Sequence, residues 1–142
     1  MAAEDYTTEL NCIRTFLDAV HTVATFNHAP VEASQISHVL DASSQRGLIH
    51  PPELMSVDGD FYRKRYRIEI QEVAEAGLMT AIDNIIIGIR KFNKRTAISN
   101  FTYASAPTMC HMKYVNSGEV EVITKRSIWK CEIWIDVEWS TS

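Results

Sequence analysis

Long apolar segments, glycine, proline and cysteine are all scarce in this sequence of 142 residues. No apolar run approaches the roughly 20 residues that cross a membrane, so we expect no membrane partner. The five glycines and four prolines form no low-complexity tract, which argues against wholesale disorder. The first ten residues lack the basic and apolar segments of a secretory signal. The three cysteines, Cys12, Cys110 and Cys131, are widely spaced, which is typical of reduced thiols in a cytosol-like compartment.

The short motifs of common enzymes are also absent. There is no phosphate-binding or dinucleotide-binding glycine loop, no serine-hydrolase elbow, no zinc motif and no EF-hand. The five histidines do not fall at zinc-ligand spacing. Carboxylates gather at Glu69, Glu72 and Glu75 and at Asp136 and Glu138, but solvated sheet faces carry such groups routinely. We therefore predict no metal site, no cofactor and no enzymatic activity.

The remaining composition is that of one ordinary domain. Hydrophobic residues make up 46%, and a chain of this length can bury roughly two thirds of its unfolded surface without a disulfide or metal. We predict a single domain over residues 1–142. The formal net charge of −4 is uneven: residues 1–60 carry a net −7, residues 61–95 a net +4 and residues 96–142 a net −1. Such an uneven distribution of charge is informative about binding partners and not about the fold.

Two segments show the periodicity of amphipathic helices. Apolar residues recur at steps of three and four in residues 5–26, and Asn27 and Pro30 are expected to end this helix. The second helix is predicted over residues 77–93, where Gly88 indicates a place of close packing. The two apolar stripes comprise Leu10, Ile13, Leu17, Val20 and Ala24, and Leu78, Ile82, Ile85, Ile86 and Ile89.

Two long segments, residues 61–73 and 127–139, alternate between apolar and polar residues. This is the pattern of antiparallel strands with one wet face. Cys131 falls on the apolar face of the last strand, so we expect it to lie in the core. The predicted apolar faces comprise Tyr62, Tyr66, Ile68 and Ile70, and Trp129, Cys131, Ile133, Ile135, Val137 and Trp139.

Shorter strands are predicted at residues 97–104, 109–115 and 119–124. Residues 30–60 form an irregular or hairpin region, with a strand at 54–57 and a turn at 58–60. The order of elements predicts an α+β fold. Its single antiparallel-dominated, mixed sheet carries two amphipathic helices packed on one face, and the segment from 61 to 104 could form a strand–helix–strand crossover.

Two basic segments, residues 63–67 and 90–95, hold eight of the fourteen Lys and Arg residues. Three interpretations stay open: contact with nucleic acid phosphates, contact with an acidic face of a protein subunit, or a solvated face without a partner. The overall acidity argues against nucleic acid, and an aromatic residue on the polar face of the last strand is typical of protein interfaces. The predicted interface residues are Arg63, Arg65, Arg67, Arg90, Lys91, Lys94, Arg95 and Trp134.

The order of elements resembles the tail-terminator and tail-completion proteins of tailed viruses. The resemblance is one of pattern over most of residues 1–142: an N-terminal helix, then YRKRYRIEIQEV, GLMTAIDNIIIGIRKF and the final SIWKCEIWIDVEWS. Residues 30–60 depart from the family pattern, and no motif transfers a functional residue. The resemblance implies a virion structural protein in the virion and the host cytoplasm. It would form a homo-oligomeric ring, commonly six-fold, that binds tail and connector proteins.

Two other functions stay open. A nucleic-acid-binding module on a ferredoxin-like sheet would stack bases on aromatics such as Phe61, Tyr62 or Trp134. A small enzyme or ligand-binding domain with a scattered site would show a concave apolar pocket with converging polar groups.

Overall fold

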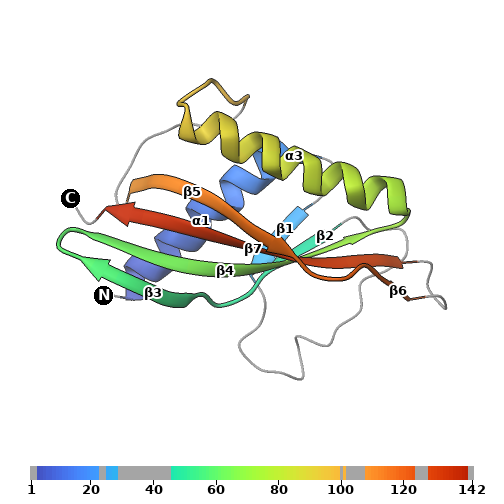
Figure 1. Ribbon diagram of the computed structural model, residues 1–142, viewed down its shortest axis with the longest axis horizontal. Coiled ribbons are helices and arrows are strands. Elements are labelled where there is room, and N and C mark those ends of the chain that lie inside the picture. The colour runs from blue at the N-terminus through green and yellow to red at the C-terminus, as the bar shows by residue number, and fades with distance from the viewer. Residues whose placement is uncertain are drawn as a thin grey trace.

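Two long antiparallel strands, β4 and β7, form the centre of the fold in the computed structural model (Figure 1). The structure describes residues 3–22, 25–28, 46–99, 101, 108–123 and 128–140. The elements are α1 (Ala3–Val20), β1 (Thr25–His28), β2 (Arg46–Ile49), β3 (Glu53–Asp58), β4 (Phe61–Glu72), α3 (Glu75–Asn93), β5 (Thr108–Ser117), β6 (Glu121–Ile123) and β7 (Ile128–Ser140).

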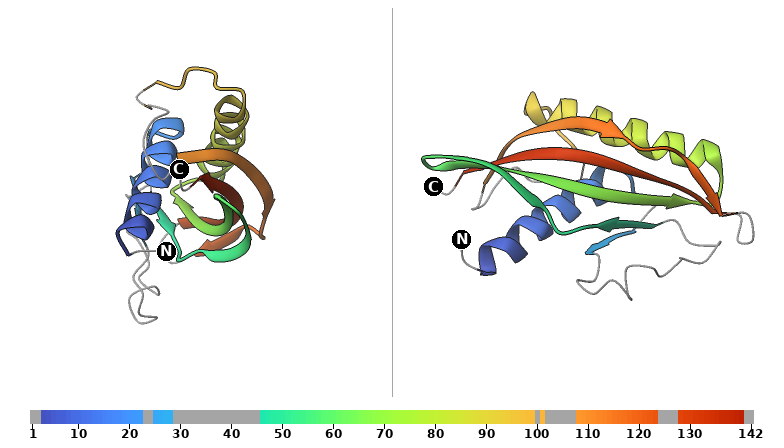
Figure 2. Two further views of the ribbon diagram at one scale, coloured as in Figure 1. Left: turned by 90° about the vertical axis from the view of Figure 1, so that its left-hand side faces the viewer. Right: turned by 60° about the horizontal axis from the view of Figure 1, so that its bottom comes forward.

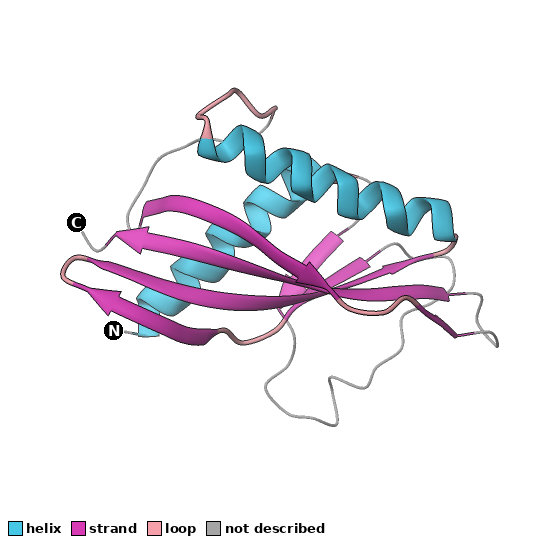
Figure 3. Ribbon diagram, viewed as in Figure 1, coloured by secondary structure: helices cyan, strands magenta, loops and turns pink. Residues whose placement is uncertain are grey.

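The strands form one mixed sheet in the order β1-β2-β4-β7-β5, with β3 added to β4 and β6 added to β7 (Figure 3). The pair β1–β2 is parallel, and every other pairing in the described part of the sheet is antiparallel. Both β4 and β5 run antiparallel to β7, so they are parallel to each other and α3 is the crossover that joins them. The α+β fold with an antiparallel-dominated sheet is confirmed.

One hydrophobic cluster joins both helices to a single face of this sheet. The even-numbered residues of β4 and the odd-numbered residues of β7 line it, as their alternation predicts. Helix α3 packs mainly along β5 and β4, whereas α1 lies beside β1, and the sheet curves past both helices (Figure 2). Cys131 is buried in this cluster, as expected.

A buried ion pair interrupts the apolar face of β4. The ammonium of Lys64 lies 2.7 Å from Glu9 Oε1, and both side chains are almost fully buried. Tyr62 donates its hydroxyl hydrogen to Glu9 Oε2, and the Lys64 ammonium lies 5.5 Å from the centre of the Tyr62 ring. Because each buried charge lies next to its counter-charge, the cost of removing it from water is offset. The contacts among Glu9, Tyr62 and Lys64 also hold α1 against β4.

Gly88 marks the closest approach of the two helices. A Cβ atom at this position would lie 2.4 Å from Val20 Cγ1 and 3.3 Å from Phe16 Cζ. The prediction of close packing at Gly88 is confirmed, and the neighbour is α1.

The N-terminal helix is shorter than predicted. It ends at Val20, and residues 25–28 form strand β1, so the prediction of a helix over 5–26 is wrong at its C-terminal end. Phe26 is fully buried in β1, and its ring occupies the space that a side chain at Gly47 of β2 would need. This pairing with a strand about twenty residues further along the chain overrides the helical periodicity.

The prediction of a strand over residues 97–104 is also wrong in its described part. Residues 97–99 and 101 are not in a strand, and residues 102–104 lie outside the described residues. Phe101 instead completes a set of edge-on aromatic contacts with Phe16 and Phe92, at centroid distances of 5.8 and 6.1 Å. Strand β2 was not predicted, because the short segment RGLI lacks an alternating pattern.

The remaining predicted elements are present within two or three residues of their expected ends. The hairpin of β3 and β4 turns at Gly59, whose φ of 62° suits glycine. The described strands β5, β6 and β7 correspond to the predictions at 109–115, 119–124 and 127–139.

Removing one member of the buried ion pair should be strongly destabilising. We expect Lys64→Met to lower the free energy of unfolding by about 3–5 kcal/mol, because Glu9 would stay buried without its counter-charge. The double variant Glu9→Leu/Lys64→Met should recover most of that loss, which chemical denaturation would measure. A double variant no more stable than Lys64→Met would contradict this account.

Gly88→Ala should destabilise the protein although alanine is the better helix residue. Alanine gains about 1 kcal/mol of helix propensity over glycine, but its methyl group would overlap Val20. We expect Val20→Ala to relieve that overlap, so that the double variant melts above Gly88→Ala alone. Thr80→Ala, at an exposed position of α3, is the matched control and should change stability by only a few tenths of a kcal/mol.

Candidate functional site

The face of β4 and β7 that points away from the helices is a surface of paired charges, which we call the outer face. The register places Arg65 directly opposite Asp136 and Arg63 opposite Glu138, whereas two acids, Glu69 and Glu132, face each other. Close opposite charges across a strand pair stabilise it. The outer face comprises Arg63, Arg65, Arg67, Glu69 and Gln71 of β4 and Lys130, Glu132, Trp134, Asp136 and Glu138 of β7.

The Arg65–Asp136 pair has the most constrained geometry on the outer face. Arg65 Nε donates to Asp136 Oδ1 at 2.7 Å, and Nη2 donates to Oδ2 at 3.1 Å. This two-point contact matches the planar guanidinium to the carboxylate. The hydrogen bond that Arg65 donates to Asp136 raises the pKa of Arg65.

Further along the same face, a second group of charges is linked diagonally. Arg67 Nη1 lies 3.1 Å from Glu132 Oε2, and Lys130 Nζ lies 3.0 Å from Glu69 Oε1. Gln71 Nε2 donates to the other oxygen of Glu69 at 3.0 Å. Both glutamates are therefore held by cations of the same chain.

His50, which follows β2, completes this group. Its backbone N–H donates to Arg67 O at 2.9 Å, and its ring Nδ1 lies 3.1 Å from Arg67 Nη2. The side chain is 3% exposed, and Nε2 has no hydrogen-bond partner among the described residues. Burial, followed by the charge of Arg67, lowers the pKa of His50. The ring is therefore neutral near pH 7.

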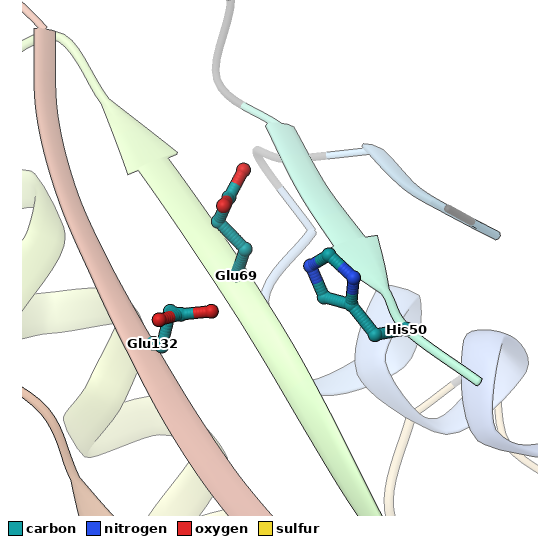
Figure 4. A group of neighbouring side chains, drawn as sticks. All are labelled: His50, Glu69 and Glu132. Carbon is teal, nitrogen blue, oxygen red and sulfur yellow. The ribbon is translucent and has the colours of Figure 1, made fainter. Parts of the chain in front are cut away.

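His50, Glu69 and Glu132 each place one possible ligand atom within 4.8 Å of the others, and the imidazole faces both glutamates (Figure 4). The contacts do not suit a divalent cation. Because Arg67 can only donate, Nδ1 must accept, and the ring hydrogen lies on Nε2 where a metal would need a lone pair. Both carboxylates already neutralise Arg67 and Lys130. We therefore assign no metal to this group.

A hollow of about 300 Å³ opens beside this group. Trp134 lies on one side of it, directly opposite Arg67 in the register, and is half-buried. None of the described lining residues offers a serine, threonine or cysteine nucleophile, and its two arginines are committed to Asp136 and Glu132. The lining residues are His50, Pro51, Glu53, Arg65, Arg67 and Trp134.

The predicted interface residues fall into two separate groups. Arg63, Arg65, Arg67 and Trp134 share the outer face, whereas residues 90–95 lie at the end of α3 in the other layer. The sequence stretch 63–67 predicted a uniform cationic stripe, but the structure pairs two of its arginines with acids of β7.

The four basic residues at the end of α3 have different environments. Arg95 is fixed: it donates to Phe92 O at 2.7 Å and to Cys110 O at 2.9 Å, and its guanidinium lies over the Phe92 ring. Arg90, Lys91 and Lys94 are exposed on the helix surface. Their role in an interface stays a prediction.

The predictions missed an exposed apolar surface on the β3–β4 hairpin. All six residues of β3 are exposed, and Val57 is 65% exposed. The sequence ELMSVDGDF predicts a hairpin but not its exposure, because exposure depends on what else covers the strand. The exposed apolar residues are Leu54, Met55, Val57 and Phe61.

Comparisons with known proteins give a likeness of fold alone. No protein family matches the sequence, and no curated protein matches it. Among solved structures, the fold is similar to a chain of the virion of a native gene transfer agent (GTA) particle, with a TM-score of 0.51 and 8% identity. The likeness covers 96% of this chain and 92% of that chain. Neither helix in the described part of the chain is long and apolar enough to span a membrane.

His50 should make the protein less stable in mild acid. Its pKa is lowered in the folded state, so the unfolded chain takes up the proton first as the pH falls below about 6.5. The free energy of unfolding should therefore fall between neutral pH and pH ~5. His50→Asn, which keeps an acceptor for Arg67, should flatten that decline in denaturation series at several pH values. His111→Asn, at an exposed position, should leave the slope unchanged, and equal slopes for all three proteins would refute the role of His50.

Proposed function

We propose that this protein is a structural component of a phage-like virion, and that it acts as a tail terminator or head–tail joining subunit through protein contacts. The observation that carries the proposal is the fold shared with a virion chain over nearly the whole of both chains. The order of elements in the sequence supports the finer assignment, because it resembles the tail-terminator and tail-completion proteins. The partners would be copies of this chain in a ring, commonly six-fold in that family, and other tail or connector proteins.

The surface supports protein contacts more than catalysis. Both arginines that line the hollow next to His50 already have carboxylate partners, Asp136 for Arg65 and Glu132 for Arg67, so neither is held ready for a substrate. Large apolar side chains are exposed instead on the β3–β4 hairpin. Contiguous exposed apolar residues are typical of sites that another protein covers.

The same contacts count against the nucleic-acid interpretation of the first basic segment. Arg65 and Arg67 are bonded to carboxylates, so binding a phosphate there would require breaking ion pairs already made. A nucleic-acid surface usually presents unpaired cations, which release counterions when they bind.

Assembly of the purified chain tests the proposal. We expect light scattering after size-exclusion chromatography to give a closed oligomer, and negative-stain electron microscopy to show rings. A strict monomer at every concentration that also fails to bind isolated phage-like tails would contradict it. Binding to a fluorescent oligonucleotide that weakens steeply with salt would favour the nucleic-acid function instead.

A further inference from the structure

Strand β3 is an exposed, apolar sheet edge, which folded proteins seldom leave uncovered. It pairs with β4 along one edge, and no described strand pairs with its other edge. Native edge strands are usually protected by charged side chains, proline, a β-bulge or a covering segment. Strand β3 has an acid at each end and a register shift between Leu54 and Ser56, but apolar side chains are exposed between the two acids. The six residues of β3 include no lysine and no proline, and all six are exposed.

The hairpin exposes apolar side chains on both of its faces. Leu54 and Val57 pair with Lys64 and Tyr62, so they lie on the helix side of the sheet. Phe61, which is 46% exposed, lies on the outer face. We call these three residues, with Met55, the hairpin patch.

Acidic groups flank the hairpin patch. Glu53 and Asp58 end β3 and are exposed, and Asp60 adds a third carboxylate in the turn. The nearest exposed cation along the strand is Arg63, which lies on the outer face opposite Glu138. A partner surface for the tip of the hairpin should therefore combine apolar area with positive charge.

The last turns of α3 offer such a surface on the same chain. Ile87 is 46% exposed, and Arg90, Lys91 and Lys94 follow it on one side of the helix at steps of three and four. No acidic residue occurs between Asn84 and Arg95, and Asp83 is the nearest carboxylate on the stripe. We call Ile87, Arg90, Lys91 and Lys94 the helix patch.

We infer that the hairpin patch of one subunit docks on the helix patch of a second copy of this chain. This inference rests on the proposed function and specifies which two surfaces meet between neighbouring subunits of the ring. The two patches lie on different parts of the molecule: β3 is at one edge of the sheet, and α3 packs along β5 at the opposite edge (Figure 1). A contact between two different surfaces repeats head to tail and can close into a ring.

The other exposed apolar edge fits the hairpin less well. Val120 and Val122 are exposed at β6, but Glu119 and Glu121 stand beside them. Docking the acidic hairpin there would bring like charges together, which is unfavourable.

Charge reversal tests the contact. Asp58→Lys and Lys94→Glu should each weaken assembly about tenfold or more, measured as the dissociation constant by sedimentation velocity. The double variant Asp58→Lys/Lys94→Glu should recover assembly, because each reversed hairpin meets a reversed helix. A one-to-one mixture of the two single variants should assemble better than either alone, because both contacts between unlike subunits are complementary. The reversed hairpin of one variant meets the reversed helix of the other, and the unreversed hairpin meets the unreversed helix.

Two reversals away from the patches are the matched controls. Arg14→Glu on α1 and Glu119→Lys before β6 are exposed and should leave the dissociation constant unchanged. Val57→Asp, at the most exposed residue of the hairpin patch, should abolish assembly while circular dichroism shows a folded chain.

The outcomes separate the docking from the proposed function. Rings that form normally with Asp58→Lys, Lys94→Glu and Val57→Asp would overturn the docking and leave the virion role standing. Loss of assembly in the controls, or no recovery in the double variant, would also overturn it. A chain that stays monomeric with every partner offered would overturn both.

Discussion

The register between β4 and β7 is the constraint on which the other features depend. Twelve consecutive residue pairs, from Phe61 with Ser140 to Glu72 with Trp129, fix which side chains point to the helices and which point away. A shift of one residue would exchange these faces and place Ile133 and Ile135 in water. Two sets of contacts hold the register in place: the hydrophobic cluster on one side and the ion pairs of the outer face on the other.

Charge compensation within the chain explains what the two faces of the sheet can do. On the helix side, Lys64 is buried and paired with Glu9. This lysine of the basic segment 63–67 therefore holds α1 against the sheet. On the outer face, Arg65 and Arg67 bind Asp136 and Glu132. A buried or half-buried charge without a partner is costly, and such pairs resist being exchanged for contacts with a ligand. The charges at the centre of the sheet are therefore compensated within the chain.

Exposed apolar and charged side chains lie instead at the margins of the sheet. Strand β3 of the hairpin is exposed along its whole length, and the end of α3 carries exposed cations next to Ile87. The paired charges therefore lie at the centre of the sheet, and the exposed apolar and basic side chains lie at its margins.

The sequence by itself determined the two long strands, helix α3 and the hairpin turn at Gly59, because each is encoded by local periodicity or by one residue's backbone preference. It also determined that Arg63, Arg65 and Arg67 share a face with Trp134. It could not determine that Thr25–His28 leaves the helix, because Phe26 packs against Gly47, a distant neighbour. Only the tertiary structure decided which of the described cations are paired and that His50 joins Glu69 and Glu132. Those facts depend on strand register and on contacts between residues far apart in the chain, which periodicity does not record.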